Sequence, residues 1–308
     1  MSIYISGSLA YDRIMNFPGK FSDHILPDKI HNLNVCFLID RLDEKRGGTA
    51  GNIAYNLALM DEKSIILSSV GKDFDRYEQV LMSLGLSFEG INRCDNMFTA
   101  GAYITTDQGD NQITGFNPGA MSVPCGYGFP HATPEADVAI VSPGNLDDMI
   151  ALPALYREKG IRYIFDPGQQ ITALTGEKML EAIHGSHMLV TNDYELELIM
   201  KATGRSKAEL LEHTGYIITT LGENGSRIDN GAPVMVPAVK ATRVLDPTGA
   251  GDAYRAGILK GLVDGLDVLG AARLGATCAS FCVEEYATQE HVFTAEAFKA
   301  RHEGAFGA

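Results

Sequence analysis

The sequence has no cluster of basic residues and no long apolar run. Its 25 Lys and Arg face 39 Asp and Glu, so the formal net charge is −14. A chain without a basic patch has no electrostatic footprint for nucleic acid or an anionic membrane. No apolar run approaches the roughly 18 residues of a membrane span, and the chain opens on a strand-like segment where a secretory leader would be charged and then apolar. These absences predict a cytoplasmic protein that binds small molecules, with neither nucleic acid nor membrane as a partner.

Cysteine is also scarce. The five cysteines are odd in number and scattered, which favours free thiols in a reducing compartment. Cys278 and Cys282 stand four residues apart in an apolar helical pattern, and no second pair completes a zinc site. We therefore expect both side chains to pack in the core.

The common glycine-rich nucleotide motifs are missing as well. No G-x-x-x-x-G-K-[ST] occurs, which excludes an ordinary P-loop. A compact motif, Gly249-Ala250-Gly251-Asp252, lies in the last fifth of the chain. The third glycine of a dinucleotide fingerprint would fall on Tyr254, so a Rossmann dehydrogenase fits poorly.

That motif contains a turn that leads into a helix. Apolar residues recur at helical spacing after it, so Asp252 falls in the first helical turn. Backbone N–H groups at a helix N-terminus attract an anion, whereas a carboxylate there repels a resting phosphate. The combination suits phosphoryl transfer, in which Asp252 takes a proton from the hydroxyl that attacks phosphorus. A tight turn followed by an acidic residue that compensates the helix dipole is the structural alternative.

Short apolar runs alternate with helical patterns along most of the chain. This alternation predicts an α/β fold with a parallel sheet covered on both faces, and ligands bind at the carboxyl edge of such sheets. The predicted strands are 3–6, 64–70, 137–141, 163–165, 188–191 and 216–219. The predicted helices lie near 50–60, 73–84, 147–158, 177–184, 193–202, 206–213, 250–264 and 267–283.

Two segments interrupt the alternation. Residues 11–46 have extended patterns without a crossover helix, and residues 97–121 read as a hairpin that turns at 107–111. Together they predict a small β-sheet lid, which would exclude water from a transferred phosphoryl group. The predicted body comprises residues 1–10, 47–96 and 122–308, and the predicted lid comprises 11–46 and 97–121.

Further polar positions have both a functional and a structural interpretation. Asp12, with Asn16 four residues on, suits two sugar hydroxyls or caps a turn. Asn192 and Glu195 suit Mg²⁺ held through water beside phosphates, or they form a capping box. Residues 219–226 hold a nucleotide phosphate or form a hairpin.

The order of the motifs G-G-x-x-G-N, N-x-x-E, T-L-G-x-x-G and G-A-G-D resembles the ribokinase (PfkB) family of carbohydrate and nucleoside kinases. The resemblance covers essentially the whole chain. It implies a ribokinase-like fold, namely a three-layer α/β/α body with a mostly parallel sheet and a small β-sheet lid. It also implies ATP and Mg²⁺ as cofactors, and K⁺ as in many members.

The resemblance assigns roles residue by residue. Asp252 would be the base, and the N–H groups of Gly249, Ala250 and Gly251 would form the anion hole. Asn192 and Glu195 would contact Mg²⁺ and phosphates, with the metal on Glu195 through water. The other implied contacts are with ATP for Thr220, Gly222 and Gly225, and with the substrate's sugar for Asp12, Asn16, Gly47, Gly48 and Asn52. A monovalent cation would lie at Asp246 and Thr248, in a site closed by residues 285–289.

Within the family, segments such as 7–12, 116–122 and 166–170 are similar to bacterial adenosine kinases of the actinobacterial type. In that group an aromatic residue at the place of Phe116 stacks on the purine, and glutamines near Gln169 and Gln170 approach the substrate. A second aromatic of that group falls here on Ala102, with Tyr103 beside it.

The resulting prediction is a kinase that phosphorylates the 5′-hydroxyl of adenosine to AMP, as in purine salvage. A free-sugar kinase of the ribokinase or fructokinase type is the alternative, and a catalytically silent nucleotide-binding regulator is a rival from another class. A lid with an exposed face also predicts a homodimer formed through the lid.

Overall fold

The structure is a computed structural model that describes residues 1–307. Its larger sheet has nine strands in the order β13-β12-β11-β10-β9-β8-β1-β4-β5. Neighbours from β5 to β11 pair in parallel, and β12 and β13 are added antiparallel. The strands are β1 (Ile3–Ser6), β4 (Ser64–Gly71), β5 (Ile91–Cys94), β8 (Val138–Val141), β9 (Arg162–Phe165), β10 (Ser186–Asn192), β11 (Thr214–Thr220), β12 (Ser226–Asp229) and β13 (Val234–Val236).

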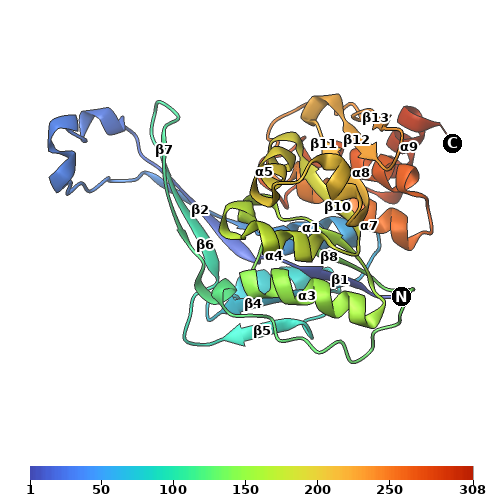
Figure 1. The fold of residues 1–308 in the computed structure, drawn as a ribbon. Helices are drawn as coiled ribbons and strands as arrows, with labels where there is room; N and C mark the ends of the chain where they lie inside the picture. The colour runs from blue at the N-terminus through green and yellow to red at the C-terminus, as the bar shows by residue number, and fades with distance from the viewer. Residues whose placement is uncertain (308) are drawn as a thin grey trace.

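Helices cover both faces of this sheet, because alternate residues of its strands point to opposite sides (Figure 1). In β1, Ile3 and Ile5 enter one hydrophobic core and Tyr4 enters the other. The first core is covered by α1 (Thr49–Leu59), α2 (Asp75–Ser83), α7 (Ala250–Val263) and α8 (Val268–Cys282). The second is covered by α3 (Leu146–Lys159), α4 (Gly176–Ile183), α5 (Asp193–Thr203) and α6 (Lys207–Leu211). The predicted three-layer fold is confirmed.

A second sheet of four strands projects from the body (Figure 1). Its order is β3 (Arg41–Gly47), β2 (Ala10–Asn16), β6 (Ala100–Thr106) and β7 (Gln112–Asn117). We refer to these four strands as the lid sheet. The chain between β2 and β3 extends beyond the end of this sheet farthest from the body (Figure 1). The strands come from the two segments that interrupt the α/β alternation in the sequence.

The predicted strands and helices do not include four elements, of which only β12 was implied, by the hairpin interpretation of residues 219–226. Strands β5, β12 and β13 are three or four residues long, and β5 and β12 each contain charged or amide side chains. Helix α9 (Ala295–Phe306) packs against α8 but buries none of its side chains fully, so it has little amphipathic signal. None of the helices in residues 1–307 has the length and apolar composition needed to cross a membrane.

Helices α7 and α8 approach each other closely because small residues line their contact. A Cβ built on Gly257 would lie 2.6 Å from the backbone of Gly275, and one on Gly261 would lie 2.5 Å from the Cα of Ala271. These contacts hold α7, and therefore the Gly249–Asp252 turn at its start, against the body.

Replacing Gly257 by Ala should therefore lower the free energy of unfolding by about 1–3 kcal/mol, since the helices must separate. Gly304→Ala in α9 is the matched control, because no atom lies within 4 Å of its added Cβ. That change should stabilise the protein by about 0.5–1 kcal/mol through helix propensity. Urea denaturation of both variants measures the difference, and equal effects would contradict the close packing.

Candidate active site

Asp252 and Asn52, 200 residues apart in sequence, meet at the start of two packed helices. The Nδ2 of Asn52, in the first turns of α1, donates a 2.7 Å hydrogen bond to Oδ2 of Asp252, in the first turn of α7. The contact brings together the two glycine motifs that the sequence analysis singled out. Asn52 is only 4% exposed, whereas Asp252 is half-buried.

A chain of further hydrogen bonds holds the side chain of Asn52 in place. Nε2 of Gln289 donates to Oδ1 of Asn52 at 2.9 Å and to the hydroxyl of Tyr77 at 2.6 Å. The Tyr77 hydroxyl donates in turn to the carbonyl of Gly47, at the end of β3, at 2.9 Å. Sequence reasoning missed Tyr77 and named Gln289 in no role of its own, because neither belongs to a motif.

The turn before α7 presents backbone N–H groups to the surface. Gly249 has a φ of 82°, a left-handed conformation that favours glycine, and a Cβ there would lie 2.9 Å from Thr288. Of the three amides predicted to form the anion hole, that of Ala250 donates to the Pro247 carbonyl at 3.2 Å. Within residues 1–307 the amides of Gly249, Gly251 and Asp252 have no acceptor, as expected for a helix N-terminus.

Burial raises the pKa of Asp252 to about 6, and the hydrogen bond from Asn52 and the charge of Arg255 oppose this rise. At neutral pH the carboxylate is therefore ionised, yet its proton affinity is higher than that of an exposed aspartate. A group with this pKa can accept a proton from a bound hydroxyl.

Arg255, to which the sequence assigned no role, lies one turn after Asp252. Its Nη2 donates to Oδ1 of Asp166 at 2.7 Å, its Nε also contacts Asp166, and its Nη1 donates to the Gly251 carbonyl at 3.0 Å. Both members of this ion pair are nearly inaccessible to solvent.

The lid sheet aligns two candidate substrate residues in one row, with Ala102 between them. Asp12 on β2 is paired with Ala102 on β6, and Ala102 is paired with Phe116 on β7. Paired residues share a face, so these three side chains lie on the same side of the sheet. Asp12 is thus a strand residue and not a turn cap. Asn16 shares the face but lies about 13 Å farther along the strand.

Tyr103 points to the opposite face of the lid sheet, where its hydroxyl accepts a 3.0 Å hydrogen bond from Nη1 of Arg13. The face with Asp12 and Phe116 therefore carries only the small side chain of Ala102 between them.

Gly47 and Gly48 join the lid sheet to α1. Gly48 has a φ of 87°, and a Cβ there would lie 2.5 Å from the Ser8 carbonyl oxygen. A Cβ on Gly47 would lie 2.8 Å from Oδ2 of Asp12, so this glycine makes room for the Asp12 carboxylate.

Asn192 and Glu195 form the capping box of α5. Oδ1 of Asn192 accepts from the Glu195 amide at 2.7 Å, and Oε2 of Glu195 accepts from the Asn192 amide at 2.8 Å. The second carboxylate oxygen of Glu195 has no hydrogen bond among residues 1–307. In the same range, no three His, Cys, Asp or Glu side chains gather as a metal site. This donor set fits an Mg²⁺ ion held mainly by phosphates and water, with Glu195 as an outer carboxylate.

The other predicted residues lie around the carboxyl edge of the sheet. Thr220 ends β11 and donates to the Thr191 carbonyl at 3.3 Å. Gly222 and Gly225 turn the chain into β12, which makes this motif a hairpin. Gln170 donates to the Gly144 carbonyl at 3.1 Å, and Gln169 is exposed.

Asp246 lies in the loop before α7, and its carboxylate binds backbone amides of that loop and of a second loop. Its carboxylate accepts from the amides of Thr248 at 2.9 Å and of Ala287 at 3.0 Å, and these bonds lower its pKa despite partial burial. The loop of residues 285–289, predicted to close a cation site, is therefore tied to Asp246.

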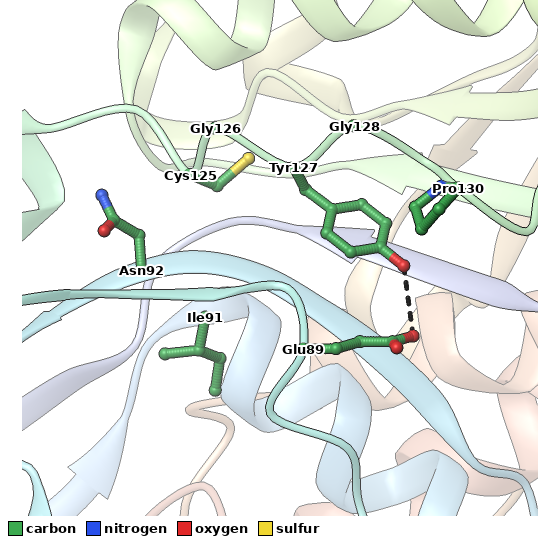
Figure 2. Close-up of a pocket in the computed structure, with 8 residues that line it drawn as sticks. All are labelled: Glu89, Ile91, Asn92, Cys125, Gly126, Tyr127, Gly128 and Pro130. Atoms are coloured by element: carbon green, nitrogen blue, oxygen red, sulfur yellow. Dashed lines mark hydrogen bonds between the residues drawn. The ribbon is translucent and has the colours of Figure 1, made fainter.

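A separate cavity of about 420 Å³ lies beside β5, away from these residues (Figure 2). Its Tyr127 hydroxyl donates to Glu89 at 3.1 Å, and burial raises the pKa of the Cys125 thiol to about 11. None of the predicted site residues lines it, and its thiol is not ionised at neutral pH.

Replacing Asp252 by Asn should stabilise the protein at alkaline pH. Because the folded-state pKa lies above the unfolded value of 3.8, the charge costs folding energy above pH 6 and nothing below about pH 4. We expect a gain of up to about 3 kcal/mol at pH 8 that vanishes at pH 4, measured by denaturant unfolding across pH. Asp246→Asn is the control of opposite sign, because its lowered pKa stabilises the fold at high pH.

The sequence and structure have clear relatives. The pfkB family of carbohydrate kinases matches residues 21–295. A nucleoside kinase of Methanocaldococcus jannaschii is 32% identical over 271 residues, which cover 87% of this chain and 88% of that protein.

Solved structures of Burkholderia thailandensis nucleoside kinase have the same fold. The complex with inosine has a TM-score of 0.86 at 35% identity and covers 100% of this chain and 99% of that one. The complex with ADP-inosine has a TM-score of 0.85 at 36% identity, with coverages of 100% and 97%. The chain therefore belongs to the pfkB family of carbohydrate kinases and is a phosphotransferase that acts on a hydroxyl group.

Proposed function

We propose that this protein transfers the γ-phosphoryl group of ATP to the 5′-hydroxyl of a nucleoside, with adenosine as the preferred substrate. The observation that carries the proposal is the Asp252 carboxylate, which stands beside free amides at a helix N-terminus and is oriented by Asn52. The relatives named above support a purine nucleoside, since one of their structures contains inosine and another ADP-inosine.

In the proposed reaction, Asp252 orients the hydroxyl and takes its proton late in an in-line transfer. The amides of Gly249, Gly251 and Asp252 face the phosphoryl group and stabilise the charge that develops on it. Gly249 and Ala250 shape this turn. The ionised Asp252 is available for this task above about pH 6.

The substrate would lie against the lid sheet. Asp12 accepts hydrogen bonds from two ribose hydroxyls, and the backbone of Gly47 and Gly48 approaches the sugar closely. Phe116 stacks on the base, 55% exposed in the absence of ligand. Asn52 acts on the sugar only through Asp252 in this arrangement, because it is buried. Gln169 and Gln170 approach the substrate from the body.

The nucleotide would lie on the other side of Asp252, near the capping box of α5. Thr220, Gly222 and Gly225 line it, and Asn192 and Glu195 hold water around an Mg²⁺ ion. When bound, Mg²⁺ neutralises phosphate charge. Asp246 and Thr248 belong to the loop that would hold a monovalent cation such as K⁺.

We also propose that residues 11–46 and 97–121 close over the substrate as a lid and pair with a second copy of the chain. The face of the lid sheet turned away from Asp12 exposes Leu42, Tyr103 and Ile113, which a partner would cover.

The first test is ADP release from Mg·ATP with adenosine, inosine, ribose, fructose and fructose 6-phosphate. We expect turnover with adenosine foremost. Asp252→Asn should keep substrate binding and lose at least about 10²-fold in kcat, because the proton acceptor is gone. Turnover with ribose or fructose alone would keep Asp252 as base but overturn the nucleoside assignment.

The second test separates the two faces of the lid sheet. Phe116→Ala should raise KM for adenosine by about tenfold or more, since a base–aromatic stack contributes about 1–3 kcal/mol. Ile113→Ala on the same strand is the matched control, because Ile113 is also exposed but faces the other side. An unchanged KM in Phe116→Ala would remove the stacking role.

A further inference from the structure

Arg255 and Asp166 form a buried ion pair directly behind the candidate base. Arg255 is 6% exposed and Asp166 is 2% exposed. Two guanidinium nitrogens meet the Asp166 carboxylate, one of them at 2.7 Å. A buried ion pair is a poor source of net stability, because its desolvation offsets its attraction. Its position next to Asp252 therefore calls for a functional explanation.

The guanidinium reaches back to the first turn of α7 because helical side chains lean toward the N-terminus. There its Nη1 donates to the Gly251 carbonyl at 3.0 Å. A Cβ on Gly251 would lie 2.9 Å from this same nitrogen, so the glycine makes room for Arg255. The Gly251 carbonyl belongs to the same peptide unit as the Asp252 N–H, one of the free amides of this turn.

Charged and titratable groups surround Asp252 on several elements. Arg255 on α7 is the cation that favours its ionised form, and Asp166, after β9, opposes ionisation. Glu195 on α5 acts on both members of that ion pair, and Cys282 on α8 is neutral because its pKa is raised to about 12. From α1, the uncharged side-chain amide of Asn52 donates a hydrogen bond to the Asp252 carboxylate. Arg255 is thus the positive charge that balances the acidic groups in this region.

We propose that Arg255 is a positioning residue for phosphoryl transfer: anchored by Asp166, it holds the Gly251–Asp252 peptide in place and keeps a fixed positive charge beside the Asp252 carboxylate. This inference rests on the proposed function of Asp252 as the base. It also gives Gly251, the third residue of the Gly249–Asp252 motif, a second role, because a glycine at this position leaves room for the Arg255 guanidinium.

The two partners of the pair should shift the acid limb of the kcat–pH profile in opposite directions. Arg255→Met removes the positive charge and should move the limb up by about one pH unit or more, because the Asp252 carboxyl then holds its proton more tightly. Asp166→Asn removes a negative charge and should move the limb down. The double variant removes both charges, so its limb should return toward the wild-type position.

The plateau of kcat at high pH measures the other part of the proposed role, namely that Arg255 holds the Gly251–Asp252 peptide in place. It should fall about tenfold or more in Arg255→Met and in the double variant, because the peptide at 251 loses its support. Arg255→Lys keeps the charge without the forked geometry, so its limb should stay near wild type while its plateau falls. Arg93→Met, which breaks a remote ion pair with Glu78, is the control and should alter neither quantity.

A titration that does not need turnover separates this inference from the proposed function. Protein labelled with ¹³C at the aspartate carboxyl carbon gives one signal that disappears in Asp252→Asn, and its midpoint can be followed in each variant. If no substrate is turned over, the proposed function fails, but opposite midpoint shifts would still support the charge pairing. Shifts of the same sign, or no shift in variants that remain folded by circular dichroism, would overturn it. The double variant leaves no unpaired buried charge, so it keeps the test valid if a single variant unfolds.

Discussion

The hydrogen bond from Asn52 to Asp252 is the contact on which the candidate site depends. It connects the start of α1 to the start of α7, and the hydrogen bonds of Gln289 and Tyr77 extend it to the end of β3. The Gly249–Asp252 turn, the body and the lid sheet are therefore linked through buried polar groups. Such groups must be satisfied where water is excluded, so each one restricts the orientation of the next.

The same constraint explains why the site combines a raised proton affinity with an ionised carboxylate. Burial alone raises the pKa of Asp252, and the amide of Asn52 and the charge of Arg255 limit the rise to about 6. The Asp252 carboxylate thus has a neutral neighbour, Asn52, on α1 and a cationic neighbour, Arg255, on α7. A carboxylate with these properties needs packed helices, because the start of α7 supplies the guanidinium and the free backbone N–H groups but the amide comes from α1.

The two faces of the lid sheet follow in part from the two-residue period of its strands. Alternation along β2 and β6 puts Asp12 and Ala102 on one face and Arg13 and Tyr103 on the other. The sequence did not decide whether the Tyr103 side chain contributes to a pocket for the nucleobase. Pairing with β7 then adds Phe116 to the first face, which only the register between strands decides. One aromatic residue and a small neighbour leave that face open.

Much of the fold was predictable because short apolar runs mark the parallel strands and a 3.6-residue apolar period marks the helices. Strands β5 and β13, at the two edges of the sheet, and β12 beside β13 were not predictable in this way. The first and last of these in sequence have only four and three residues, and β5 and β12 mix apolar with polar side chains, so none has a distinct period. The N-x-x-E motif had two interpretations. The structure shows the capping box of α5, whereas the Mg²⁺ role of the same residues stays a prediction. A local motif predicts a local hydrogen bond but not what lies beyond it.

The sequence by itself determined the α/β alternation, the two interrupting β segments and the glycine-rich turns, because each depends on neighbours within a few residues. It also marked Asp252 as the first-turn carboxylate of a helix. Only the tertiary structure decided that Asn52, Gln289 and Tyr77 support that carboxylate and that the Arg255–Asp166 pair lies behind it. These contacts join residues far apart in the chain, and they exist only after the sheet has aligned its carboxyl edge and α1 and α7 have packed together.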